Sequence, residues 1–123
     1  MKNAVGAITL FVRDKDRARE FYARVFEADV LFEDETSAAF RFENTIVNLV
    51  ADPAELIEPA PVGSGTTAMY TLFVADCDAA VAELRSRGVE LLNGPVDRAW
   101  GQRTAAFADP DGHAWEVAQD LSS

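Results

Sequence analysis

The sequence predicts an α+β fold in which one compact domain, residues 1–123, holds two tandem modules with the element order βαβββ. Three observations predict it: a ten-residue segment occurs twice, apolar residues with helical spacing follow each copy, and three short strand patterns follow each helix. Module one would span about residues 4–51 and module two residues 66–119. A connector rich in Pro, Gly and Ala would span residues 52–65.

The repeated segment ends a strand and begins a helix in each module. Residues 9–18 read TLFVRDKDRA and residues 71–80 read TLFVADCDAA. Seven of the ten positions are identical, and the starts lie 71 − 9 = 62 residues apart. Asp14 and Asp76 follow the apolar run, where an aspartate can accept hydrogen bonds from the free N–H groups of a first helical turn. The chain therefore contains a duplication.

Apolar residues with helical spacing follow both aspartates, and strand patterns follow the helices. The expected buried stripes are Ala18, Phe21, Tyr22 and Val25 in the first helix and Ala80, Val81 and Leu84 in the second. Gly88 stands where a glycine commonly ends a helix. Strands are expected at residues 30–35, 37–43 and 45–51, and at residues 89–96, 102–108 and 113–119. Each module would thus be a four-stranded sheet with a helix on one face.

Side-chain alternation assigns the two faces of each sheet. Ile8, Leu10 and Val12 should pack under the first helix, and Trp115 in the last strand should pack under the second and belong to the core. The opposite, inner faces would carry Ala7, Thr9, Phe11, Met69, Thr71, Phe73 and Glu116. Small, polar and aromatic side chains are mixed there, which predicts a cavity between curved mixed sheets.

The charge and composition exclude several partners. The chain has 21 acidic and 11 basic residues, a formal net charge of −10 and a pI near 4.4. Such a field repels phosphate backbones, so we expect no nucleic acid partner, and it favours cationic small molecules. No apolar run is long enough to cross a bilayer, and charged residues begin too early for a signal peptide. We therefore expect a cytoplasmic protein with no membrane partner.

Three segments carry a resemblance to a known family: VRDKDRAREFY in module one, and FVADCDAAVAELRSRGVEL and WGQRTAAFADPDGHAWEVAQ in module two. They resemble the vicinal oxygen chelate superfamily, which includes glyoxalase I, the bleomycin-resistance proteins and the extradiol dioxygenases. The W-G-x-R, D-P-D-G and H-x-W-E patterns are similar to the bleomycin-resistance branch. The resemblance runs from about Ala4 to Gln119 and implies the glyoxalase/bleomycin-resistance/dioxygenase fold, which hosts many functions.

The resemblance also implies where a metal would bind. In metal-using members, His or Glu ligands lie on the inner faces of the first and last strands of each module, the first-strand ligand seven residues before the capping aspartate. The matching positions here hold Ala7, Asn48, Met69 and Glu116. Only Glu116 keeps a ligand type of the family, whereas a catalytic metal site normally has about three good protein ligands. We therefore expect no metal, no cofactor and no catalytic residue.

Eight residues are predicted to contact a small-molecule ligand. Glu116 would bind a cationic group or act as a general base, or it would be a hydrated carboxylate paired with Arg103 or Arg41. Trp100 would stack on a planar ligand or cover a sheet edge, and the two inner-face phenylalanines would line a pocket or fill the space between the sheets. The complete set is Thr9, Phe11, Asn48, Met69, Thr71, Phe73, Trp100 and Glu116.

Other reactive side chains favour structural roles. Cys77 begins the second helix, where the dipole can favour a thiolate, but Asp76 and Asp78 oppose that charge and no base is evident. His113 is expected to serve the turn before the last strand. Residues 33–35, Glu-Asp-Glu, would form a solvated strand end or attract a cation to a nearby groove.

Three functions remain open at this point. The first is a metal-independent small-molecule binder similar to the bleomycin-resistance proteins, which bind a basic, planar antibiotic in grooves of a homodimer. The second is a metal-dependent lyase, isomerase or dioxygenase with an atypical site around Asn48, His113 and Glu116. The third is a regulatory or interaction module without a ligand. We expect a homodimer in each case.

Overall fold

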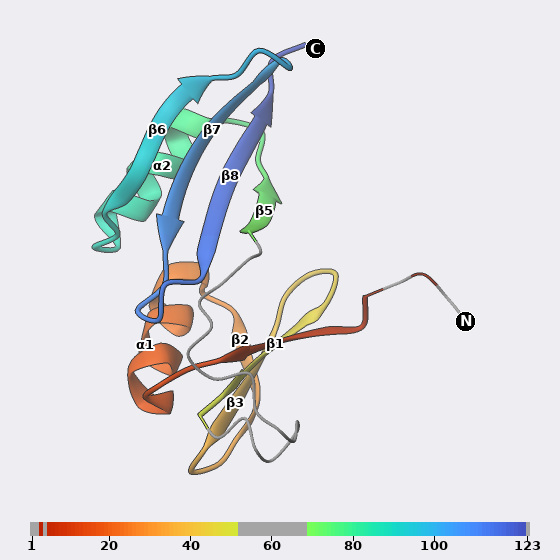
Figure 1. Ribbon diagram of the computed structural model, residues 1–123, viewed down its shortest axis with the longest axis vertical. Coiled ribbons are helices and arrows are strands. Elements are labelled where there is room, and N and C mark those ends of the chain that lie inside the picture. Colours follow the sequence, from red (N-terminus) through yellow and green to blue (C-terminus); the bar gives the residue numbers. More distant parts are fainter. Residues whose placement is uncertain (1–2, 4, 52–68, 123) are drawn as a thin grey trace. The chain divides into compact units, whose positions relative to one another are not determined.

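The structure is a computed structural model that describes Asn3, residues 5–51 and residues 69–122 (Figure 1). The chain divides between Gly65 and Thr66 into two compact units, and each is described by itself. The expected connector, residues 52–65, lies outside the described residues. Within the described part of the chain, no helix is both long enough and apolar enough to span a bilayer.

Both units have the predicted order of one strand, one helix and three further strands. The first contains β1 (Ala7–Phe11), α1 (Lys15–Phe26), β2 (Asp29–Glu33), β3 (Ser37–Arg41) and β4 (Ile46–Val50). The second contains β5 (Met69–Phe73), α2 (Cys77–Ser86), β6 (Leu91–Asp97), β7 (Gln102–Ala108) and β8 (Ala114–Asp120). The predicted α+β fold of two tandem βαβββ modules is therefore confirmed.

Each unit has one four-stranded mixed sheet, with the strand orders β1-β4-β3-β2 and β5-β8-β7-β6. The first strand of each unit pairs in parallel with the last, and the remaining pairs are antiparallel. In Figure 1, α2 lies against one face of the sheet formed by β5 to β8. The opposite face of each sheet, called the open face below, is not covered by the helix of its own unit.

The repeated aspartates begin the helices as predicted. The Asp14 carboxylate accepts a hydrogen bond from the Arg17 N–H at 3.1 Å, and Asp76 accepts one from the Ala79 N–H at 3.0 Å. The residues of α1 predicted to be buried are the ones observed: Ala18, Phe21, Tyr22 and Val25. In α2 the buried stripe is Cys77, Val81 and Leu84. Ala80 is only half-buried, because this stripe starts at the first helical residue and recurs at i+4 and i+7.

The two helices end differently. After α2, Gly88 has φ +82°, its N–H donates to the Arg85 carbonyl, and the Val89 N–H donates to the Leu84 carbonyl, both at 3.1 Å. This is a Schellman ending, closed by the buried side chains of Leu84 and Val89. After α1, Glu27 takes the left-handed conformation with φ 51°, which is strained for a residue with a side chain. Both units therefore have the helix, but only the second has a glycine at the left-handed position that follows it.

The core of each unit lies between the helix and its sheet. In the first unit, the rings of Tyr22 and Phe40 lie 6.2 Å apart, and both side chains are fully buried. In the second, the Trp115 ring packs 5.0 Å from that of Tyr70 and is 3% exposed. Trp115 is therefore a core residue, as the alternation predicts, and its neighbour Glu116 points to the open face.

Edge strand β6 is irregular around Gly94. Its register with β7 shifts between Leu91 and Asn93 and again between Asn93 and Val96. Gly94 has φ +88°, and a Cβ built on it would overlap the Thr104 carbonyl oxygen and lie 2.7 Å from the Ala105 Cα. Only a glycine lets the two backbones approach this closely.

We predict that Gly94→Ala destabilises the protein by about 3 kcal/mol, because the new methyl group meets backbone and the left-handed conformation is strained. Gly101→Ala is the matched control, since Gly101 has φ +89° but open space around its Cβ position. It should cost only about 1 kcal/mol, the strain alone. Urea unfolding followed by circular dichroism measures both. Equal losses for the two variants would contradict the proposed close approach.

Candidate ligand-binding faces

Strand pairing places equivalent residues in one row across each open face. In the first unit β1, β4, β3 and β2 contribute one residue each to a row: Thr9, Asn48, Ala39 and Phe32. In the second unit β5, β8, β7 and β6 contribute Thr71, Glu116, Ala106 and Asn93. Both rows thus read threonine, a polar residue, then alanine. We call them the first row and the second row.

The polar pair in each row is joined by a hydrogen bond, but the direction is reversed. In the second row, the Thr71 hydroxyl donates to Glu116 Oε1 at 2.9 Å. In the first row, Asn48 Nδ2 donates to the Thr9 hydroxyl oxygen at 3.3 Å. An ionised carboxylate can only accept hydrogen bonds, whereas an amide can also donate them, and Asn48 donates here. The two rows therefore share a geometry and differ by one negative charge.

The Glu116 carboxylate is surrounded by small side chains on the open face. Ala106 lies directly across from it on β7, and Ala114 and Ala118 lie two positions away along β8. Glu116 itself is half-buried. On neighbouring β5, Met69 is 52% exposed and Phe73 is 81% exposed. A carboxylate flanked by methyl groups and by exposed apolar side chains can receive a cationic group attached to an apolar body.

Arg103 is not the partner of Glu116 in this structure. Its guanidinium bonds to Asp97 at 2.6 Å and to Asp78, the second residue of α2, at 3.1 Å. Arg103 pairs in register with Gln119, on the face that packs against the helix. The predicted alternative of a Glu116–Arg103 ion pair is therefore wrong, because β7 alternation places the two residues on opposite faces.

A second polar cluster lies at the turn between β6 and β7. The Arg98 Nε–H donates to the Thr104 hydroxyl at 3.0 Å, and the Arg98 Cζ lies 5.8 Å from the centre of the Trp100 ring. The indole N–H of Trp100 donates to Gln102 Oε1 at 3.0 Å. Thr104 pairs with Ala118, so this cluster is on the same open face as Glu116. The sequence interpretation missed Arg98, although every second residue from Arg98 to Thr104 is polar or aromatic.

The predicted site residues fall into two groups. Thr71, Glu116, Met69 and Phe73 share the open face of the second unit, and Trp100 joins them from its turn. Thr9, Phe11 and Asn48 belong to the open face of the first unit. The structure adds Ala39 and Ala106, which a second internal repeat could have revealed: residues 38–40 and residues 105–107 both read AAF. The cavity between the two sheets stays a prediction.

The residues at the metal positions of the chelating relatives do not fit a metal ion. Ala7 has no donor atom, and Met69 offers only a thioether, a poor ligand for hard or borderline divalent ions. The two rows together hold one carboxylate, two amides (Asn48 and Asn93) and two hydroxyls. Among the described residues, no three His, Cys, Asp or Glu side chains gather in a way that could hold a metal.

Cys77 and His113 lie away from the open-face rows. Cys77 is fully buried, and burial together with Asp78 raises the pKa of its thiol, which disfavours the nucleophilic thiolate. His113 closes the turn before β8, where its N–H donates to Asp109 Oδ1 at 2.8 Å and its carbonyl accepts from the Asp109 N–H. The Asp109 carboxylate also accepts from the Asp111 N–H at 2.9 Å, so this turn is tightly held.

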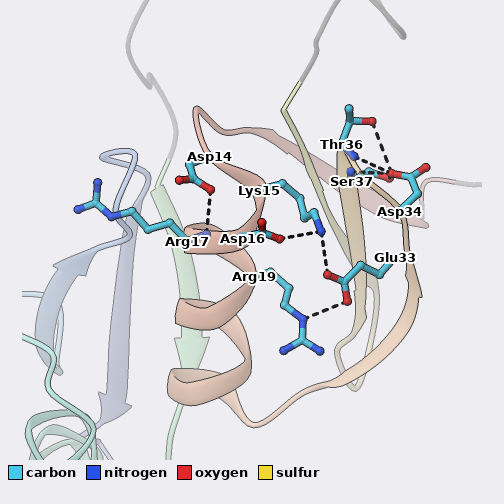
Figure 2. A network of polar contacts seen from close by, with 9 residues as sticks. All are labelled: Asp14, Lys15, Asp16, Arg17, Arg19, Glu33, Asp34, Thr36 and Ser37. Atoms are coloured by element: carbon cyan, nitrogen blue, oxygen red, sulfur yellow. Dashed lines mark hydrogen bonds and ion pairs between the residues drawn. The ribbon is translucent and has the colours of Figure 1, made fainter.

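The acidic run at residues 33–35 is largely engaged within its own unit (Figure 2). Glu33 binds Lys15 at 2.8 Å and Arg19 at 3.2 Å, so it ties edge strand β2 to helix α1. Hydrogen bonds and charge from these two bases lower the pKa of Glu33. Asp34 Oδ1 accepts from the Ser37 N–H at 2.8 Å, the Ser37 hydroxyl at 2.9 Å and the Thr36 N–H at 3.0 Å. These contacts hold the β2–β3 turn and favour the structural role over cation attraction.

The hydrogen bonds from Ser37 and Thr36 lower the pKa of the Asp34 carboxyl below its ordinary value of 3.8. The folded state then binds fewer protons than the unfolded state, so the contribution is complete above that value and is lost as the pH falls through the lower folded pKa. We predict that Asp34→Ala lowers stability near pH 7 and that this difference from the wild type shrinks as the pH falls below the ordinary value of 3.8 and through the lower folded pKa. Urea midpoints measured across this range check the prediction.

Glu35→Ala is the control for Asp34, because it removes a neighbouring acidic residue for which the described part of the chain shows no hydrogen bond or ion pair. Its unfolding midpoint should stay close to that of the wild type at every pH. A stability difference for Asp34→Ala that is independent of pH would contradict the role of the carboxylate charge.

Comparisons with known proteins agree with this architecture. The model of the Glyoxalase/Bleomycin resistance protein/Dioxygenase superfamily matches residues 4–117. A glyoxalase/bleomycin resistance protein/dioxygenase from Nocardioides is 26% identical with a TM-score of 0.86, over 100% of this chain and 87% of that chain. The antibiotic binding protein TnmS3 from Streptomyces sp. CB03234 is 28% identical with a TM-score of 0.75, over 97% of each chain.

A lactoylglutathione lyase from Agrobacterium tumefaciens has a TM-score of 0.77 over 97% of this chain and 95% of that chain, but the identity is 19%. At that identity the similarity shows a shared fold and carries no reaction with it. Whether the chain binds a ligand or catalyses a reaction must therefore be argued from the side chains on the open faces.

Proposed function

The chain belongs to the Glyoxalase/Bleomycin resistance protein/Dioxygenase superfamily, and we propose that it binds a planar small molecule through a cationic group, without a metal and without breaking a bond. One observation carries the proposal. The Glu116 carboxylate, oriented by Thr71 among alanines, lies on an open face at the row position where the first unit has neutral Asn48.

Three further features support a cationic, planar ligand. The net charge of −10 raises the local concentration of cations around the whole chain. Met69 and Phe73 offer exposed apolar surface on the strand next to Glu116, and Trp100 offers an exposed indole at the turn on the same open face. The antibiotic binding protein TnmS3, at 28% identity, supports an antibiotic-like molecule as the ligand and sequestration as the activity. In the first unit, Thr9, Phe11 and Asn48 stay candidate contacts.

Metal independence is supported by chemistry at the four positions where chelating relatives hold ligands. Ala7 and Asn48 cannot replace histidine or glutamate, and Met69 leaves Glu116 as the one anionic donor among the four. A single carboxylate whose neighbours in the second row are neutral suits an organic cation better than a divalent ion, because an organic cation needs no complete coordination shell.

We predict that 2-(aminomethyl)naphthalene binds the protein and that its neutral counterpart, 2-(hydroxymethyl)naphthalene, binds at least tenfold more weakly. Glu116→Gln should remove this preference, because a charge-assisted contact contributes about 1.5–3 kcal/mol. Quenching of tryptophan fluorescence during titration measures the affinities. Glu90→Gln, which removes the same charge from an exposed position in the second unit, should bind like the wild type.

Two results would overturn the proposal. One is the absence of any response to a diverse panel of planar cationic aromatic compounds. The other is stoichiometric zinc, nickel, iron or manganese in protein purified without chelators, which would favour the metal-dependent enzyme. We expect the affinities for the cationic compounds to be the same before and after the protein is treated with a chelator.

We also propose that the chain is a homodimer, because large apolar side chains are exposed on both open faces, among them Phe32 (57%) and Phe73 (81%). Sedimentation equilibrium should therefore report a mass of twice the 13.4 kDa of one chain. A single species of monomer mass at tens of micromolar protein would contradict this proposal.

A further inference from the structure

Two opposite charges share the open face of the second unit without neutralising each other. Glu116 bonds to Thr71, and Arg98 bonds to Thr104. Among the ion pairs of the described residues, none joins Glu116 to Arg98. Each charge is thus oriented by its own threonine, and each keeps part of its hydrogen-bonding capacity for another group.

The separation of the two charges follows from the strand register. Glu116 pairs with Thr71 and Ala106 in the second row, and Thr104 pairs with Ala118 in the row two residues further along β8. Rows of this kind are about 6.6–7 Å apart along a strand. A molecule the size of one or two fused rings can therefore reach both charges at once.

Arg98 keeps the part of its guanidinium that binds carboxylates best. Its Nε–H is used by Thr104, and within residues 5–51 and 69–122 no hydrogen bond or ion pair uses the two terminal amino groups, a pair of parallel donors that matches the two oxygens of a carboxylate. Arg98 is half-buried as a residue and its guanidinium lies against the Trp100 ring, so a carboxylate bound there would have the indole on one side.

Two backbone hydrogen bonds close the turn that carries Arg98 and Trp100. The Arg98 N–H donates to the Gln102 carbonyl at 2.7 Å, the Gly101 N–H donates to the Arg98 carbonyl at 3.0 Å, and Gly101 has φ +89°. This is a three-residue hairpin loop with glycine in the left-handed position. The Gln102 side chain fixes the indole, which is nevertheless 69% exposed. Trp100 is therefore an exposed ring oriented by a hydrogen bond to the strand that follows it, which suits stacking against a planar molecule.

We propose that Arg98 is a specificity-determining residue that binds a carboxylate of the ligand, so that the open face of the second unit selects an amphoteric aromatic molecule. Its basic group would bind Glu116, its carboxylate would bind Arg98, and its ring would lie against Trp100. The inference rests on the proposed function, to which it adds the second charge of the ligand.

The test compares 6-(aminomethyl)-2-naphthoate with its methyl ester and with 2-(aminomethyl)naphthalene by isothermal titration calorimetry. The wild type should bind the carboxylate at least tenfold more tightly than the ester, which has the same ring and the same amine. Arg98→Gln should abolish this preference and leave the affinity for the ester within about threefold. Arg85→Gln, which removes one positive charge from an exposed position on α2, should keep the preference.

The failures of the two proposals are distinguishable. If none of the three naphthalene compounds binds, this inference fails, whereas the proposed function fails only if the diverse panel of planar cationic compounds also gives no response. If the amine binds but the wild type does not distinguish the carboxylate from its ester, only the role of Arg98 fails. That comparison needs no variant, so it stands even if Arg98→Gln does not fold. A preference retained in Arg98→Gln would also overturn the role of Arg98.

Discussion

The packing of one helix against one face of each sheet is the constraint on which the open faces depend. Once Leu10 lies under α1 and Trp115 lies under α2, strand alternation leaves no choice for their neighbours. Thr9 and Glu116 must then point to the other side. The polar rows are therefore a consequence of core formation, and the apolar contacts beneath them provide the rigidity that holds them in register.

The two units show what a duplication preserves. The capping aspartates, the buried AAF phenylalanines Phe40 and Phe107, and the parallel pairing of first and last strand are the same in both. These features determine whether a unit folds. The polar residue next to threonine differs, Asn48 in one unit and Glu116 in the other, and so does the residue that ends the helix. The two units therefore differ at an open-face position, where the side chain does not contribute to the core, and at the residue that follows the helix.

The sequence was sufficient to predict the features that depend on neighbours in the chain. Asp14 and Asp76 cap helices through contacts within three residues, and the period of apolar residues marks the stripe of α1. It was not sufficient for contacts that depend on pairing register. Ala106 is important because it lies across from Glu116, and Arg98 because a turn brings it to Thr104. The alternative Glu116–Arg103 ion pair is wrong for the same reason, because the pairing of β7 with β8 decides which residues of the two strands share a face.

The turn held by the Asp109 carboxylate sets the length of chain that leads into β8, with hydrogen bonds to the N–H groups of Asp111 and His113. Adding or deleting one residue there would shift the strand by one position and exchange the faces of Trp115 and Glu116. That exchange would bury a carboxylate and expose an indole. A point substitution can therefore alter this face and keep the core, as the difference between Asn48 and Glu116 illustrates, whereas a shift of the strand by one residue would disrupt the core itself.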